Sequence, residues 1–302
     1  MAGLLDYQHV EISFNGNAVV HDVTFQLHPG EILGMVGESG SGKSTLIKAA
    51  MGLLGSSGMV TRGDIWFEGK NLPDLSDGEM RHICGEKIGM IFQDCGTSLS
   101  PIRTIGEQIV ESMAAHRKVD VPTAKAAAME LFDKLKLKDG ERVWNSYPFE
   151  LSGGMNQRAG IAIAMLMNPV ILLADEPTSA LDVAVQRQVV EEMLNVRDIF
   201  GTAIIIVTHD IGVVSAMADS ILVLRDGRVM EYGRAKDVLE NPRNGYTRKL
   251  LSAASTRIFN FPGFAAATSR VCRRCCSGSL TAGPAEPFRR RASGRCPLPA
   301  FP

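Results

Sequence analysis

The sequence predicts an α/β fold, with a core of parallel β-strands, an antiparallel β edge and a mostly helical insertion. Short continuous apolar runs, typical of parallel strands buried on both faces, recur along the chain. These runs are Ile32–Val36, Ile88–Phe92, Val170–Ala174 and Ile204–Val207. Segments with helical spacing lie between them, and turn signals elsewhere mark antiparallel hairpins.

Two hairpins and one further strand account for the antiparallel part. Apolar and polar residues alternate over Val10–Leu27 around Asn15-Gly16, which predicts the first hairpin. Gly63–Glu68 adds a strand with an aromatic pair. The second hairpin, Ile221–Tyr232, turns on Asp226-Gly227.

Apolar residues at helical spacing predict two amphipathic helices. One face consists of Ala128, Leu131, Phe132 and Leu135, and the other of Val185, Val189, Met193 and Val196. The first face falls within residues 98–165, the stretch that we expect to form the helical insertion in the α/β core.

Composition excludes several classes of protein for the predicted domain, residues 1–250. No apolar run approaches the ~18 residues that a membrane helix needs. Met1–Val10 lacks the basic start and apolar segment of a secretory signal, so we expect a cytosolic protein. The net charge is −1, but residues 251–302 hold eight arginines and one acidic residue, so the body before them is acidic. An acidic body offers no electrostatic footprint for nucleic acid.

Residues 251–302 form a separate tail that we expect to be disordered and dispensable for the main activity. Its arginines repel one another, and its Pro, Gly, Ala and Ser leave little apolar surface to bury. Three alternatives stay open. The tail's cysteines could bind a metal or an iron–sulfur cluster, its arginines could contact anionic lipid, or the end could be unrelated to the body. The cysteines are Cys272, Cys275, Cys276 and Cys296.

A glycine-rich loop after the first apolar run predicts a phosphate-binding site. It matches G-x-x-x-x-G-K-[ST] and lies between a strand and a helical segment, where backbone N–H groups and a helix N-terminus can bind phosphate. The loop comprises Gly37, Glu38, Ser39, Gly40, Ser41, Gly42, Lys43 and Ser44, and Thr45 continues into the helix. We expect Lys43 to bridge the β- and γ-phosphates and Ser44 to ligate Mg²⁺. The alternative is a Gly/Ser-rich loop with an incidental lysine.

Two carboxylates end the apolar run Val170–Ala174. Asp175 can reach the Mg²⁺ shell, and Glu176 is placed to orient an attacking water. An acidic pair after a buried strand can also be a solvated strand end, so this pair alone does not decide between the two interpretations.

A second phosphate-binding nest precedes these carboxylates. Ser152, Gly153 and Gly154 open a helix predicted over Met155–Met167, where N–H groups and the helix dipole favour an anion. One nucleotide does not need two distant phosphate nests in one domain. We therefore infer that this nest covers the γ-phosphate of a nucleotide held by another subunit, with ATP between two subunits. The alternative is a helix cap with glycines for tight packing.

Taken in order over residues 7 to about 250, these motifs resemble those of the ABC transporter ATPase family. The resemblance rests on the phosphate loop, Gln93 after the second run, the segments LSGGMNQR, LLADEP and Ser179–Asp182, and His209 after the fourth run. It implies a P-loop NTPase cassette with a RecA-like core, an antiparallel β subdomain and an inserted helical subdomain at about 98–165.

The resemblance also implies individual roles. Gln93 would be a lid residue that contacts Mg²⁺ and couples to membrane subunits, and His209 would contact the γ-phosphate. Together with Lys43 and Glu176 they would be the catalytic residues. Asp182 would organise the interface, Phe14 would stack on adenine, and Gln157 would belong to the partner-facing nest. Taken singly, Gln93 could be a surface residue, Phe14 a core residue and His209 a structural histidine.

A finer resemblance is to the branch of importers for peptides and nickel. It rests on residues 92–108, on the segment YPFELSGG from Tyr147, and on residues 241–248. Cys95-Gly96 departs from that branch, which usually has proline after Gln-Asp. The resemblance implies an ATP-binding and hydrolysing subunit, using ATP and Mg²⁺, that powers import of peptides or nickel-type metal complexes.

The implied partners are a second ATPase subunit of the same or a different chain, two membrane permease subunits and, indirectly, an extracytoplasmic substrate-binding protein. The implied location is peripheral, at the cytoplasmic face of the inner membrane. Two rivals are a soluble ABC ATPase of DNA repair or translation and a regulatory cassette that only binds ATP. The first class carries a long coiled-coil insertion or two cassettes, and the intact Lys43, Glu176 and His209 argue against the second.

Overall fold

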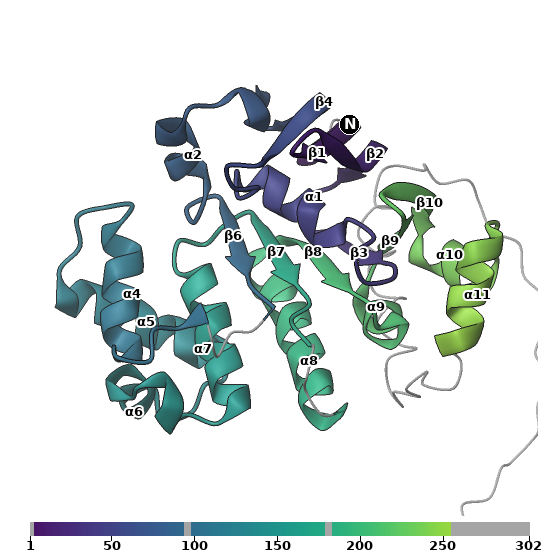
Figure 1. The fold of residues 1–302 in the computed structure, drawn as a ribbon. Helices are drawn as coiled ribbons and strands as arrows, with labels where there is room; N and C mark the ends of the chain where they lie inside the picture. The colour runs from purple at the N-terminus through teal and green to yellow at the C-terminus, as the bar shows by residue number, and fades with distance from the viewer. Residues whose placement is uncertain (1–2, 94–97, 179–182, 255–302) are drawn as a thin grey trace, which may run out of the picture. The chain divides into compact units, whose positions relative to one another are not determined.

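Two β-sheets share one apolar core in the computed structural model, which describes residues 3–93, 98–178 and 183–254 (Figure 1). The four-stranded antiparallel sheet has the order β2 (Asn17–Leu27), β1 (Leu5–Phe14), β4 (Gly58–Phe67) and β5 (Lys70–Asn71). The six-stranded sheet has the order β10 (Arg228–Arg234), β9 (Ser220–Arg225), β3 (Ile32–Val36), β8 (Ala203–Thr208), β7 (Ile171–Asp175) and β6 (Ile88–Ile91). Strands β9, β3, β8, β7 and β6 are parallel, and β10 is an antiparallel edge.

Successive side chains of the parallel strands point to opposite faces of the sheet, and each face is covered by a different layer. In β7, Ile171 and Leu173 pack toward the antiparallel sheet and helix α1 (Lys43–Ala50), while Leu172 and Ala174 pack toward the opposite layer. This alternation is expected because successive side chains of a strand point to opposite faces. Figure 1 shows α1 between the two sheets and helices α7 (Gly153–Met165), α8 (Val183–Phe200) and α9 (Ile211–Met217) on the other face.

Buried aromatic residues tie helix α1 to the antiparallel sheet. The ring of Tyr7 stacks on Phe25 with centroids 4.3 Å apart, and both side chains are fully buried. The Tyr7 hydroxyl donates a hydrogen bond of 2.8 Å to the Leu46 carbonyl in α1. Burial raises the pKa of Tyr7, so this hydroxyl stays a donor.

The insertion is helical, as predicted. It comprises α4 (Ile105–Ala114), α5 (Val121–Lys134), α6 (Gly140–Asn145), a 3₁₀ turn (Pro148–Glu150) and α7. Ala128, Leu131, Phe132 and Leu135 form the buried face predicted for α5. Gly106 in α4 is needed for close packing, because a Cβ there would lie 2.4 Å from Cε2 of the Trp144 ring in α6.

Further helices surround this core. They are α2 (Asp77–Ile83), α10 (Ala235–Glu240) and α11 (Gly245–Ala254), with a 3₁₀ turn at Leu72–Asp74. Helix α11 runs past the predicted domain end near residue 250, and the rest of the predicted tail lies outside the described residues. Among the helices that the structure describes, none has the length and apolar character needed to cross a bilayer.

Several predicted boundaries were wrong. The first hairpin begins at Leu5 rather than Val10, and the strand predicted from Gly63 begins at Gly58. The helix predicted from Met155 begins at Gly153. In α8, Val189, Met193 and Val196 are buried, as predicted, whereas Val185 of the same predicted face is only partly buried.

Candidate functional site

The parallel sheet brings the predicted site residues to one edge. Strands β3, β6, β7 and β8 run in the same direction, so their carboxyl ends lie together. The phosphate loop follows β3, Gln93 follows β6, Asp175 ends β7 with Glu176 after it, and His209 follows β8. Strand topology therefore assembles residues that are up to 172 positions apart in the sequence.

The phosphate loop has a backbone conformation that requires glycine. Gly40 and Gly42 have φ of 80° and 96°, in the left-handed region that favours glycine. At Gly37, a Cβ would lie 2.1 Å from the Leu224 carbonyl oxygen, so any side chain would clash with β9. Gly42 is also the N-cap of α1, and no side chain caps that helix. The N-terminal N–H groups of α1 are thus left for a ligand, as in an anion-binding nest.

Two segments that sequence reasoning did not assign to the site support this loop. The N–H of Gly227, in the turn between β9 and β10, donates to the Ser41 carbonyl at 3.2 Å. The His21 N–H of β2 donates in turn to the Gly227 carbonyl at 2.8 Å. The sequence identified Asp226-Gly227 only as a hairpin turn, and a turn signal does not say what the turn packs against.

Lys43 is held inside the loop by backbone carbonyls. Its Nζ donates to the carbonyls of Gly37 at 2.8 Å and Glu38 at 2.7 Å, and to the Ser41 hydroxyl at 3.3 Å. The side chain is buried, and burial lowers the pKa of Lys43, while the nearby carboxylates, Glu176 first among them, oppose this shift. A buried ammonium with few solvent contacts is suited to pair with a phosphate oxygen.

Ser44 and Asp175 fit a Mg²⁺ site. The Ser44 hydroxyl donates 2.6 Å to Oδ1 of Asp175, which is itself buried at the end of β7. Mg²⁺ prefers oxygen ligands and is usually held by one or two carboxylates with substrate phosphates and waters, rather than by a complete protein cage. No cluster of three or more His, Cys, Asp or Glu occurs among the residues that the structure describes.

Glu176 lies between two polar side chains. Nε2 of Gln93 donates to its Oε2 at 3.3 Å, and Nδ1 of His209 lies 3.5 Å from its Oε1. The Glu176 backbone has φ 46°, an uncommon conformation for a residue with a side chain. Its N–H donates to the Val207 carbonyl of β8 at 2.8 Å. The structure thus brings Gln93, Glu176 and His209 together, as the proposed division of roles requires.

The second nest forms the start of helix α7. Ser152 is the N-cap, with its hydroxyl accepting from the Met155 N–H at 3.4 Å, and Ser152 and Gly153 are exposed. Gly153 has open space at its Cβ position. Gln157 lies differently: its buried side chain donates 2.6 Å to the Pro177 carbonyl, in the loop after Glu176. The serine and first glycine thus face outward, whereas Gln157 links α7 to the carboxylate loop of its own chain.

Phe14 and Asp182 were also predicted for the site. Phe14 ends β1 and its ring covers Gly58, where a Cβ would lie 2.6 Å from Cε1 of the phenylalanine. Phe14 is partly buried and packs against the apolar cluster between the two sheets. Asp182 lies outside the described residues.

A cavity of about 260 Å³ lies between β6, the strand before Gln93, and the helical insertion. Sequence reasoning did not find it, because its walls come from segments distant in the chain. The cavity is lined by Met51, Gly85, Gly89, Met90, Ile91, Phe92, Ser98, Leu99, Ser112, Gly160, Ile163 and Ala164. Most of these residues are apolar, and Phe92 is exposed.

Comparison with known proteins agrees with this geometry. Residues 20–179 match the ABC transporter family model. The chain is 43% identical over 257 residues to the oligopeptide transport ATP-binding protein OppD of Haemophilus influenzae, covering 84% of this chain and 79% of that protein. It is 39% identical over 271 residues to the dipeptide transport ATP-binding protein DppD of Lactococcus lactis, covering 86% and 78%.

Among solved structures, a dimeric post-hydrolysis state of the ATP-binding cassette MJ0796, bound to ADP and Pi, matches with a TM-score of 0.66 and 28% identity. The match covers 76% of this chain and 98% of the cassette. The family match, the relatives and the assembled site agree. The chain therefore belongs to the ABC transporter family and is an ATP-binding, ATP-hydrolysing subunit of it.

Proposed function

We propose that this subunit hydrolyses ATP to power import of peptides through a membrane transporter. The observation that carries the hydrolytic part is the position of Glu176, held between Gln93 and His209 beside the phosphate loop. The names of the relatives, oligopeptide and dipeptide transport proteins, favour peptides over nickel-type complexes.

The residues divide the work of phosphoryl transfer. Backbone N–H groups of loop 37–44 and the Lys43 ammonium bind the phosphates of ATP. Ser44 and Asp175 would hold Mg²⁺, with Gln93 beside them, and the ion when bound neutralises charge on the phosphates. Glu176 accepts a hydrogen bond from the attacking water and orients it. His209 contacts the γ-phosphate and, with Gln93, fixes the orientation of the Glu176 carboxylate.

A second cassette completes each site in this proposal. The exposed Ser152 and Gly153 at the start of α7 are free to cover a nucleotide held on the loop of another subunit. The partner cassette is the same chain or a different one, with Asp182 at the interface and Phe14 stacking on adenine. The dimeric state of the related cassette structure supports this arrangement.

The apolar cavity beside Gln93 is the proposed contact with the membrane permeases. It adjoins Phe92, which directly precedes Gln93, so an occupant would lie close to the catalytic edge. The subunit would then be peripheral, at the cytoplasmic face of the membrane, with two permeases as direct partners. An extracytoplasmic substrate-binding protein would act through those permeases, and nucleic acid is not a partner.

ATP turnover of the assembled transporter in lipid vesicles tests this function. With a peptide-loaded substrate-binding protein present, we expect peptide to stimulate ATP turnover. Peptide should also accumulate inside those vesicles in which the transporter is oriented for uptake. Lys43→Ala, which removes a direct phosphate contact, should abolish both. ATP binding without turnover would favour a regulatory cassette, and turnover that peptide never stimulates would exclude the peptide importer.

A further inference from the structure

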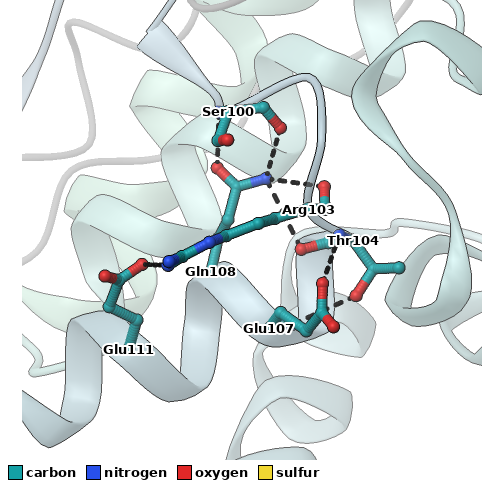
Figure 2. A network of polar contacts seen from close by, with 6 residues as sticks. All are labelled: Ser100, Arg103, Thr104, Glu107, Gln108 and Glu111. Atoms are coloured by element: carbon teal, nitrogen blue, oxygen red, sulfur yellow. Dashed lines mark hydrogen bonds and ion pairs between the residues drawn. The ribbon is translucent and has the colours of Figure 1, made fainter.

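One side chain, Gln108 of helix α4, holds a wall of the cavity. Its Oε1 accepts a hydrogen bond of 2.8 Å from the Ser100 N–H, and its Nε2 donates back to the Ser100 carbonyl at 3.1 Å. The same Nε2 reaches the carbonyls of Arg103 at 3.1 Å and Thr104 at 3.4 Å. Figure 2 shows this side chain between the segment at Ser100 and the first turn of α4. The amide therefore pairs with Ser100 in the way that a neighbouring strand would.

The segment held in this way is part of the cavity. Ser98 and Leu99 line it, directly before Ser100, and Leu99 also belongs to the apolar cluster that joins the helical insertion to the parallel sheet. Pro101 follows Ser100 and has no N–H of its own. Backbone groups here must find partners outside regular structure, and Gln108 supplies the acceptor for the Ser100 N–H and a donor to the Ser100 carbonyl.

The two sides of the cavity belong to different parts of the fold. Met90 and Ile91 come from strand β6 of the core, and Phe92 follows that strand. Ser112 comes from α4 and Ile163 from α7, both in the helical insertion. The hydrogen bonds of Gln108 fasten Ser100, next to the lining residues Ser98 and Leu99, to the α4 side of the cavity.

Neighbouring polar contacts stabilise the helix without holding the segment. Thr104 caps α4: its hydroxyl accepts from the Glu107 N–H at 3.2 Å, and Glu107 accepts from the Thr104 N–H at 2.8 Å. Arg103 and Glu111 form an exposed ion pair on the same helix (Figure 2). The Arg103 N–H also donates to the Ser100 carbonyl at 3.4 Å, but this is a backbone contact, so replacing the Thr104 side chain removes the helix cap and leaves the bonds to Ser100 in place; Thr104 therefore provides a matched control.

We propose that Gln108 is a positioning residue of the permease docking site. It fixes the wall Ser98–Ser100 to α4, so that a permease segment seated in the cavity moves the helical insertion and the wall together. The proposal deepens the proposed function and rests on it, since it names a residue that holds the docking surface in place relative to the helical insertion.

Gln108→Ala in the full chain, assembled with its permease subunits, tests this role. Affinity for the permeases and peptide-stimulated kcat should each fall roughly 3- to 30-fold, the range of a coupling residue that touches neither ligand. KM for ATP and the basal turnover of the chain alone should stay within about twofold, because no nucleotide contact is lost. Gln108→Glu keeps an acceptor for the Ser100 N–H but turns a carboxylate oxygen toward the carbonyls that Nε2 now donates to, so its effect should be at least as large as that of Gln108→Ala.

Thr104→Ala is the control. It should cost about 1 kcal/mol of stability through the lost cap, with little effect on permease affinity or coupled kcat. Hydrogen exchange at the Ser100 amide should be fast in Gln108→Ala and remain slow in Thr104→Ala. Equal losses in the two variants, or wild-type affinity and coupling in Gln108→Ala, would overturn the proposal.

The two proposals fail in different ways. A wild-type complex that assembles but is not stimulated by peptide would contradict the peptide function, while the permease-affinity measurement would still decide the role of Gln108.

Discussion

Glu176 shows how the fold fixes a single carboxylate. The residue follows β7 with φ 46°, a backbone conformation that costs of order 1 kcal/mol for a residue with a Cβ. The hydrogen bond from its N–H to the Val207 carbonyl helps to hold this conformation. The side chain then points between Gln93 and His209.

Replacing this carboxylate by an amide should separate binding from hydrolysis. In Glu176→Gln, we expect ATP affinity to be retained, because no phosphate contact is lost, while turnover falls by a factor of ~10² or more. Nucleotide titration and steady-state turnover measure the two effects. Glu191→Gln, the same chemical change at an exposed residue of α8, is the control and should leave both unchanged. Near-normal turnover in Glu176→Gln would remove the residue from its assigned role.

At the scale of helices and strands, a largely buried ion pair joins α7 and α8. Arg158 of α7 bonds Oε1 of Glu192 in α8, whose side chain is buried. The other oxygen, Oε2, has no hydrogen-bond partner among the residues that the structure describes. Burial raises the pKa of Glu192 above its ordinary 4.5, and Arg158 opposes this shift only in part. The pair therefore links two helices at a cost in desolvation.

The raised pKa predicts a pH-dependent stability. The folded chain binds the Glu192 proton more tightly than the unfolded chain, so this residue's contribution is most favourable below 4.5 and is lost as pH rises toward the folded pKa. Relative to wild type, Glu192→Gln should gain unfolding free energy over that window and then level off. Chemical denaturation across a pH series measures the difference. A constant difference, or a loss for Glu192→Gln as pH rises, would contradict the prediction.

Most strands of the parallel sheet could be predicted, because burial on both faces produces continuous apolar runs. The start of β1 could not, since His9 has φ 52° and interrupts the alternation of buried residues. The same irregularity explains why the predicted start of β4 was wrong. Gly63, with φ 78°, packs against the His9 carbonyl, so a glycine inside the strand was interpreted as the beginning of the strand. Helix α2 was missed although Ser76 and Glu79 form a capping box, because the helix is short.

At the scale of the whole molecule, the site was easier to predict than its surroundings. Residues that follow parallel strands meet at one edge by topology, so the positions of Lys43, Asp175, Glu176 and His209 follow from the motifs. The support of the phosphate loop by Gly227 and the cavity wall held by Gln108 depend on tertiary contacts that no spacing encodes.

The central claim is that each site is made by two chains, with Glu176 from one and Ser152 from the other. The direct measurement mixes two variants of this chain, Ser152→Arg and Glu176→Gln, under conditions in which the wild-type chain alone turns over ATP. Each variant alone should be inactive. In a mixed pair one of the two sites has both wild-type residues, so an equimolar mixture should recover about one quarter of wild-type turnover. A mixture no more active than its components would contradict the shared site.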